Sequence, residues 1–274
     1  MLDKDLFLKK YGLTNTSIEE ALLTWSNLEE IYEDYLTRLN NYKNILLNFT
    51  NKLSDISGLK YIHQRVKDPE HLLEKIIRKK LIVDKNNYRD KITDILACKI
   101  IYLYKTDWPE IHKWIINNFG SNLHERPKVY TIKSEEAFYK DKDVEIILRD
   151  TYYQSVHYLV EFSDVKIEIQ VRSIYQEAWG EIDHQLRYPY EVNNPVLNDF
   201  SKLLNELTIV SDKLAFLINN YKKLFNQEER IFLTPSQIES IKAEMSDEQF
   251  KRFREIVTSN YNLITIDELL KRIN

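Results

Sequence analysis

The 274-residue sequence is poor in glycine and cysteine and has no long apolar run. Only four glycines are present, which disfavours the glycine-rich loops that cradle phosphate in many nucleotide-binding proteins. The single cysteine, Cys98, excludes an internal disulfide and a cysteine metal cluster. Its apolar neighbours in ILACKII predict a buried side chain that behaves as a small hydrophobic residue.

Membrane and export signals are also missing from the sequence. No stretch approaches the ~18 consecutive apolar residues of a membrane span, and the start MLDKDLFLKK lacks the basic region and apolar core of a signal peptide. We therefore expect a cytoplasmic protein with no membrane partner. Apolar residues at 43% and aromatic residues at 12% predict a folded chain rather than a disordered one.

Positive charge is concentrated in one part of the chain. The net charge of −4 argues against a protein that coats nucleic acid by bulk charge. Between Lys60 and Lys91, however, the cations clearly outnumber the acids. This local excess suits a polyphosphate or a nucleic-acid strand. A solvated helix face would explain it as well.

The pattern of apolar residues predicts alternating helices and strands. From Trp25 to Leu53, apolar residues recur at steps of three and four, which predicts one long helix with a single apolar stripe. That stripe could pack on the protein's own core or form a coiled coil. The expected strands cover 61–67, 94–104, 128–132, 153–162 and 165–173. The expected helices cover 69–80, opened by Pro69, and 108–119, 174–188 and 197–224.

These elements predict an α+β fold, with a mixed, largely antiparallel β-sheet flanked by helices and with helical N- and C-terminal extensions. We divide the chain into an N-terminal helical segment packed on the core (1–57), a central domain that holds the sheet (58–225) and a small helical C-terminal appendage (226–274). Only Ser163 and Asp164 separate the last two strands, which indicates an antiparallel hairpin.

Alternation in VKIEIQVRS (165–173) gives that strand one polar face. The face carries Glu168, Gln170 and Arg172, while Tyr153 and His157 share a face of the preceding strand. Asp94 begins the buried strand DILACKII, and a pair of carboxylates can hold Mg²⁺ in a nucleotide-handling site. Taken singly, Asp94 could equally be a turn or cap residue and Glu168 a solvated strand residue.

Four motifs together resemble the synthetase domain of RelA/SpoT proteins, and the chain as a whole resembles a small alarmone synthetase. They are RVKDPEHLLEKIIRK, DILACK, YYQSVHY and EIQVRSIYQEAWGEIDHQLRY, which span about residues 60 to 190 in the family's order. The resemblance implies a nucleotidyltransferase-like synthetase fold. It also implies a pyrophosphokinase, a GTP diphosphokinase that transfers the β,γ-diphosphate of ATP to the 3′-hydroxyl of GDP or GTP and releases AMP.

The resemblance assigns roles to individual residues. Asp94 and Glu168 correspond to the catalytic, Mg²⁺-binding carboxylates, and Glu168 would also activate the attacking hydroxyl. Lys99 stands where the family usually has an arginine against adenine. The implied ATP-binding residues are Arg65, Lys67, Lys75, Arg78 and Lys99. The implied acceptor-binding residues are Arg149, Tyr153, His157, Gln170 and Arg172.

Two alternatives stay open at this stage. Toxic relatives of the family place the diphosphate on the 3′ end of tRNA, and an RNA backbone could be drawn in by Lys79, Lys80, Lys85 and Arg89. The chain could also be a binding module that has lost catalysis. The expected partners are therefore ATP with GDP or GTP, or tRNA, and in addition an antitoxin or an oligomer partner.

Overall fold

The computed structural model describes residues 2–150, 152–187, 191, 193–226, 239, 242–243, 246–248 and 250–251. The chain divides into two units, Met1–Phe216 and Leu217–Asn274. The predicted appendage 226–274 lies largely outside the described residues. Among the described helices, none has both the length and the hydropathy needed to cross a membrane.

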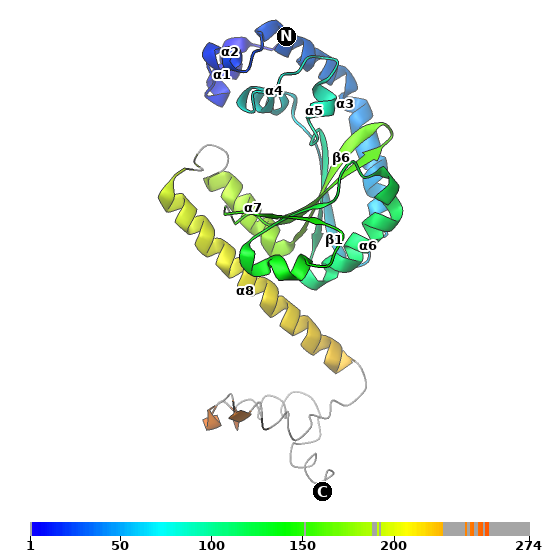
Figure 1. Ribbon diagram of the computed structural model, residues 1–274, viewed down its shortest axis with the longest axis vertical. Coiled ribbons are helices and arrows are strands. Elements are labelled where there is room, and N and C mark those ends of the chain that lie inside the picture. The colour runs from blue at the N-terminus through cyan, green and yellow to red at the C-terminus, as the bar shows by residue number, and fades with distance from the viewer. Residues whose placement is uncertain are drawn as a thin grey trace. The chain divides into compact units, whose positions relative to one another are not determined.

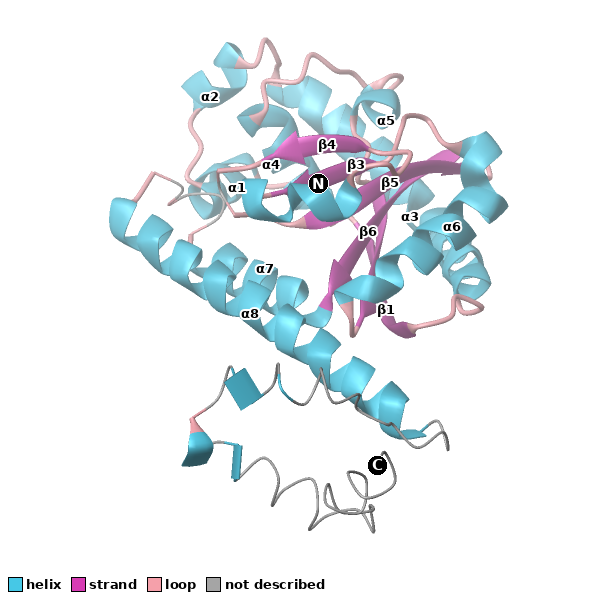
Figure 2. Cartoon of the chain, turned by 60° about the horizontal axis from the view of Figure 1, so that its bottom comes forward, coloured by secondary structure: helices cyan, strands magenta, loops and turns pink. Residues whose placement is uncertain are grey.

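A six-stranded mixed sheet forms the centre of the first unit (Figure 2). Its strands lie in the order β1-β2-β6-β5-β3-β4. Three neighbouring pairs are antiparallel (β1/β2, β6/β5 and β5/β3) and two are parallel (β2/β6 and β3/β4), which confirms the predicted fold class. The strands are β1 (Leu59–Val66), β2 (Leu96–Tyr102), β3 (Lys128–Thr131), β4 (Glu145–Leu148), β5 (Ser155–Phe162) and β6 (Val165–Ser173).

Helices make up most of the remaining chain. The α-helices are α1 (Lys4–Tyr11), α2 (Asn15–Glu20), α3 (Trp25–Leu53), α4 (Pro69–Arg78), α5 (Tyr88–Lys91), α6 (Trp108–Phe119), α7 (Ile174–Leu186) and α8 (Pro195–Asn226). Short 3-10 helices are η1 (Lys105–Asp107), η2 (Gly120–Asn122) and η3 (Lys133–Tyr139). The sequence predicted α3, α4, α6, α7 and α8 but neither β4 nor the 3-10 helices, which are too short to show a hydrophobic period.

Side-chain caps determine where the important helices begin. Asp68 accepts hydrogen bonds from the backbone at the start of α4, and Pro69 occupies the first turn, where no backbone donor is needed. Ser173 and Gln176 form a reciprocal capping box at the start of α7. The chain therefore passes directly from the last residue of β6 into α7, which fixes α7 against the sheet.

The apolar stripe of α3 packs on the protein's own core. Leu28, Tyr35, Phe49 and Leu53 are fully buried, as the packing interpretation of the stripe required. Figure 1 shows α3 and α6 on one side of the sheet and α7 on the other. Because α3 and α6 cover the apolar face, the polar face is left toward α7.

The β5–β6 hairpin forms as predicted. Ser163 and Asp164 both have positive φ, 52° and 60°, as a two-residue type I′ turn requires. One detail differs from the prediction: β5 begins at Ser155, so Tyr153 precedes the strand. Tyr152 has a φ of 62°, and this left-handed residue interrupts the extended backbone just before the strand.

Candidate active site

The polar face of the sheet gathers side chains from three neighbouring strands. In the parallel β2/β6 pair, Lys99 is opposite Gln170 and Ala97 is opposite Glu168. In the antiparallel β5/β6 pair, His157 is opposite Gln170. Directly opposite residues project to the same face, so Lys99, His157 and Gln170 form one row across the sheet, with Glu168 beside it.

Asp94 lies just before β2 and is held between two lysines. Lys67 Nζ and Lys75 Nζ each donate to one carboxylate oxygen of Asp94 at 2.8 Å. Burial alone would raise the pKa of Asp94, but the charges and hydrogen bonds of the two lysines outweigh it and lower that pKa to about 2. Asp94 is therefore ionised at neutral pH, and it joins the end of β1 to α4.

Glu168 has different partners. Its Oε1 is 3.0 Å from His157 Nδ1, and its Oε2 accepts a hydrogen bond from Gln170 Nε2 at 3.0 Å. Burial would raise the pKa of Glu168, yet the His157 hydrogen bond and charge and the Gln170 hydrogen bond lower it overall, while the charge of Asp94 acts in the opposite sense. Two neighbouring ionised carboxylates thus stand on this face of the sheet.

Arg172 is the most highly connected residue of the acceptor-side set. Its guanidinium donates to Tyr153 Oη, Gln170 Oε1, Ser155 Oγ and Glu177 Oε2, and it lies 4.9 Å from the centre of the Tyr153 ring. Tyr153 Oη is in turn 2.8 Å from His157 Nε2. A continuous hydrogen-bond network therefore links Arg172, Tyr153 and His157 to Glu168.

Lys99 reaches α7. Its ammonium donates at 2.6 Å to both Glu177 Oε1 and Glu181 Oε1. Glu177 consequently contacts both Lys99 and Arg172, with one carboxylate oxygen for each. Glu177 of α7 therefore bridges Lys99, predicted on the ATP side, and Arg172, predicted on the acceptor side.

The remaining predicted residues lie at the margin of this cluster. Arg65 is opposite Ala97 in the β1/β2 pair and is exposed. Arg78 lies on α4 three residues after Lys75 and forms an ion pair with Glu74 at 2.7 Å. Arg149 follows β4 and stacks over Tyr130, with its guanidinium carbon 4.9 Å from the ring centre.

Two of the four cations proposed to meet RNA are engaged with acids of the N-terminal helices. Lys80 pairs with Glu20 at 2.9 Å and Lys85 with Glu30 at 3.2 Å. Lys79 is exposed at the end of α4. Arg89 lines a cavity described below, and its Nε is buried without a hydrogen-bond partner.

Five residues of the cluster were not predicted as site residues. Tyr130 packs edge-on against His157, with ring centres 4.8 Å apart. Gly180 provides space for Arg172, since a Cβ on residue 180 would lie 2.8 Å from Arg172 Nη1. Glu177 and Glu181 are four residues apart and therefore share one face of α7. This spacing is the one feature of the sequence that could have indicated the pair. The five residues are Tyr130, Ser155, Glu177, Gly180 and Glu181.

The donor set suits Mg²⁺ shared with a substrate. Within the described residues no group of three or more acidic, histidine or cysteine side chains could hold a metal ion. Mg²⁺, however, is commonly bound by one or two carboxylates together with water and substrate phosphates. Asp94 and Glu168 fit that mode, since each carboxylate oxygen has a second lone pair beyond its present hydrogen bond.

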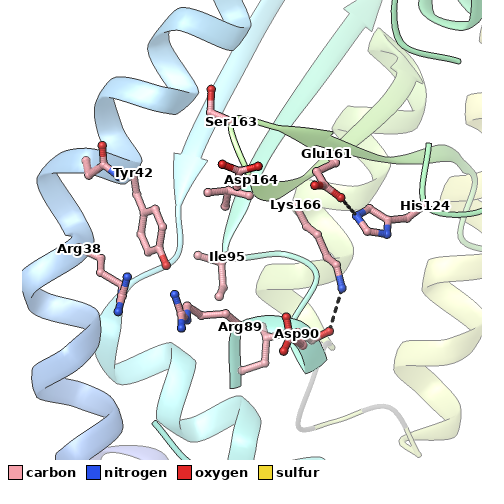
Figure 3. Close-up of a pocket in the computed structure, with 13 residues that line it drawn as sticks. Arg38, Tyr42, Arg89, Asp90, Ile95, His124, Glu161, Ser163, Asp164 and Lys166 are labelled. Carbon is pink, nitrogen blue, oxygen red and sulfur yellow. Dashed lines mark hydrogen bonds and ion pairs between the residues drawn. The ribbon is translucent and has the colours of Figure 1, made fainter. Parts of the chain in front are cut away.

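A cavity of about 510 Å³ lies elsewhere, between α3, α5 and the turn of the β5–β6 hairpin (Figure 3). Lys166 extends into it and donates to the backbone carbonyl of Asp90 at 3.1 Å, and His124 pairs with Glu161 at 2.9 Å. Neither Asp94 nor Glu168 lines this cavity. The cavity is therefore separate from the carboxylate cluster.

Comparison with known proteins gives the same family as the motifs. Residues 64–193 match the region found in RelA/SpoT proteins, a span that contains every predicted site residue. GTP pyrophosphokinase YwaC of Bacillus subtilis (strain 168) is 23% identical over 214 residues, which cover 75% of this chain and 94% of the relative.

Solved structures show the same fold. A GTP pyrophosphokinase family protein from Streptococcus pneumoniae aligns with a TM-score of 0.52 at 18% identity, over 68% of this chain and 93% of the other. Small alarmone synthetase 1 from Bacillus subtilis, bound to its product pppGpp, aligns with a TM-score of 0.52 at 18% identity, over 70% of this chain and 99% of the other. Residues 64–193 thus carry the region found in RelA/SpoT proteins, which is the family that the motifs of this chain resemble.

Proposed function

We propose that the protein is a pyrophosphokinase that transfers the β,γ-diphosphate of ATP to the 3′-hydroxyl of GDP or GTP and releases AMP. The observation that carries this proposal is the pair of ionised carboxylates, Asp94 held by two lysines and Glu168 held by His157, on one face of the sheet. The similarity to YwaC and to a synthetase bound to pppGpp supports the same reaction. A cytoplasmic location remains a prediction.

The donor side of the site is cationic. Lys67 and Lys75 would meet the phosphates of ATP, with Arg78 and Arg65 at the margin. At an effective dielectric near 20, one cation about 4 Å from a phosphate charge contributes roughly 4 kcal/mol before desolvation. Mg²⁺ held by Asp94 and Glu168 would add to this stabilisation of the charge on the transferred group.

The acceptor side supplies a base and a binding surface. Glu168 is ionised and can accept the proton of the attacking 3′-hydroxyl, while His157 and Gln170 keep its carboxylate oriented. The Tyr153 ring would stack on guanine, and Arg172 holds that ring in place by contacts to its face and hydroxyl. Orientation and electrostatics supply most of the rate enhancement in such a mechanism.

The direct test is incubation of the protein with ATP labelled in its γ-phosphate and with GDP, GTP or bulk tRNA as acceptor. We expect label in guanosine tetraphosphate or pentaphosphate and stoichiometric release of AMP. Label in tRNA alone would mean that tRNA is the acceptor in place of GDP or GTP, while the proposed diphosphate transfer would stand. Absence of transfer to all three acceptors would leave a nucleotide-binding module as the better description.

Glu168→Gln tests the proposed base. We expect at least a hundredfold loss of turnover, because general bases typically contribute 10²–10⁴-fold. Glu161→Gln on β5 is the matched control, since it makes the same chemical change on the same hairpin at a side chain that contacts His124 instead. Equal activities of the two variants would remove Glu168 from the mechanism.

A further inference from the structure

The cavity between α3, α5 and the hairpin turn contains a guanidinium with an unpaired donor. Arg89 of α5 lines the cavity, and its Nε is buried without a hydrogen-bond partner. A buried donor without an acceptor costs free energy, and the cost is larger when the donor belongs to a charged group. An anionic acceptor in the cavity would remove this cost.

Asp34 of α3, the acid that holds Arg38, has little capacity left for a second arginine. Its carboxylate accepts from Arg38 Nε at 2.8 Å and from Arg38 Nη2 at 2.9 Å, and Oδ2 also accepts from Tyr88 Oη at 2.8 Å. The bidentate pair fixes the Arg38 guanidinium and leaves its Nη1 for another acceptor. One carboxylate therefore serves two arginines of the cavity wall, and an excess of positive charge remains between them.

Tyr42 adds a hydroxyl to the two guanidiniums. It lies one turn after Arg38 on α3, and Figure 3 shows the ends of Arg38, Tyr42 and Arg89 directed toward one another. Burial raises the pKa of Tyr42, and the positive charges of Arg38 and Arg89 act in the opposite sense, as expected for a hydroxyl close to both. These three side chains, called here the donor cluster, converge from two helices on one end of the cavity.

Donors that converge from several directions suit a tetrahedral oxyanion. A guanidinium carries five N–H groups in a planar fork, and the Tyr42 hydroxyl adds a donor outside that plane. A phosphate group presents three terminal oxygens and up to two negative charges, whereas a carboxylate presents two oxygens and one charge. The donor cluster therefore matches a phosphate group better than a carboxylate.

The rest of the cavity limits what can accompany the phosphate group. Asp90, Glu161 and Asp164 are exposed acids of the cavity wall, and they would repel further phosphates on the same ligand. The volume of about 510 Å³ exceeds that of free phosphate, and Ile92 and Ile95 supply a buried apolar wall for a larger molecule. A small ligand with a single phosphate group is the best match to this combination.

We propose that the cavity is a binding site for a small molecule with one phosphate group, which Arg38, Tyr42 and Arg89 hold. The proposal does not depend on the reaction catalysed, because neither of the predicted catalytic carboxylates lines the cavity. Lys67 and Lys75, the lysines that hold Asp94, do not line it either. The two anion sites can therefore be separated by substitution.

Calorimetric titration of the full chain with inorganic phosphate and with glycerol phosphate tests the proposal. We expect Arg89→Gln to raise the dissociation constant of either probe at least tenfold, because a hydrogen bond between charged groups is lost. Lys91→Gln is the matched control, since Lys91 is an exposed cation of the same helix and does not line the cavity. Tighter binding of glycerol phosphate would support a phosphate ester as the occupant, and tighter binding of inorganic phosphate would support the free anion.

Urea unfolding separates loss of binding from loss of folding. Without phosphate, Arg89→Gln should be at least as stable as the wild type, because it removes a buried donor that has no partner. Added phosphate should then stabilise the wild type and Lys91→Gln but not Arg89→Gln. A large loss of stability in Arg89→Gln without phosphate would overturn the proposal, since Arg89 would then have a structural partner.

The choice of anion gives further outcomes that would overturn the proposal. They are no response of the wild type to millimolar phosphate, an equal response to acetate, and a phosphate response that persists in Arg89→Gln but disappears in Lys75→Gln. The last result would place the anion among the lysines that hold Asp94.

Inorganic diphosphate tests the restriction to one phosphate group. Its binding at the cavity, taken as the part of the response that Arg89→Gln removes, should be weaker than that of phosphate. Asp164→Asn should reduce this difference, because it removes one of the acids that repel a second phosphate. Tighter binding of diphosphate than of phosphate at the cavity would contradict the restriction.

Discussion

Gly180 on α7 leaves room for Arg172 of the predicted acceptor site, and Gly180→Ala should impair acceptor binding. A Cβ at position 180 would lie 2.8 Å from Nη1 of Arg172, closer than nonbonded carbon and nitrogen atoms approach. The end of an arginine side chain is usually free to move aside. Here it is not, since the guanidinium donates to four acceptors and its side chain is only 7% exposed.

The size of the effect follows from these contacts. Overpacking of a filled site costs about 1–3 kcal/mol, while alanine in place of glycine within a helix returns up to about 1 kcal/mol. The net loss of stability should therefore be small. Displacing the guanidinium from Tyr153 weakens a hydrogen bond to a charged group, a contact worth about 1.5–3 kcal/mol, and that corresponds to a rise of roughly ten- to a hundredfold in the acceptor KM.

Steady-state kinetics with the acceptor and ATP varied in turn would measure this effect. Gly120→Ala is the matched control, because the nearest atom to its added Cβ, Cγ2 of Ile116, lies at an ordinary 3.6 Å. The double variant Gly180→Ala/Arg172→Lys should be little worse than Arg172→Lys alone, since lysine lacks the clashing nitrogen. An unchanged acceptor KM in Gly180→Ala would refute the reasoning, as would additive effects in the double variant.

Two further predictions follow from the structure. Glu177→Gln should raise the KM of both the acceptor and ATP, because Glu177 contacts both Arg172 and Lys99. Glu181→Gln should raise the KM of ATP alone, because Glu181 contacts only Lys99 of this pair. Equal changes of the two KM values in both variants would contradict the bridging contact of Glu177. Asp212→Asn should stabilise the protein at pH 7 by up to about 2–3 kcal/mol and not at pH 4, as urea unfolding would show. Burial raises the pKa of Asp212 to about 6, so the folded state keeps a proton that the unfolded state loses near pH 4, and wild-type stability falls as the pH rises from 4 to 6.

Local patterns predicted the part of the site that is built from adjacent strands. Period-two alternation placed Glu168 and Gln170 on one face of β6, and the two-residue turn placed β5 beside it, so the juxtaposition with His157 could be anticipated. The lysines that hold Asp94 were predicted only through the family resemblance. They come from different elements, and nothing in their spacing shows that both reach one carboxylate.

Contacts made by α7 could not be predicted from the sequence. Glu177 and Glu181 lie 78 and 82 residues from Lys99, and a helix pattern gives no information on which distant strand an acid faces. Their pairing also changes the interpretation of Lys99. The lysine that the resemblance places on the ATP side is held by two carboxylates of α7, and these carboxylates set the position of its ammonium.

The orientation of α8 departs most from what sequence rules predict. Its range was predicted closely, but an amphipathic helix is expected to bury its apolar face. In α8 the polar face is buried because its groups have specific partners, among them the carbonyl of Tyr152, which precedes the acceptor-side Tyr153. The same helix therefore supports, from its inner face, the segment that leads into the predicted acceptor-side residues.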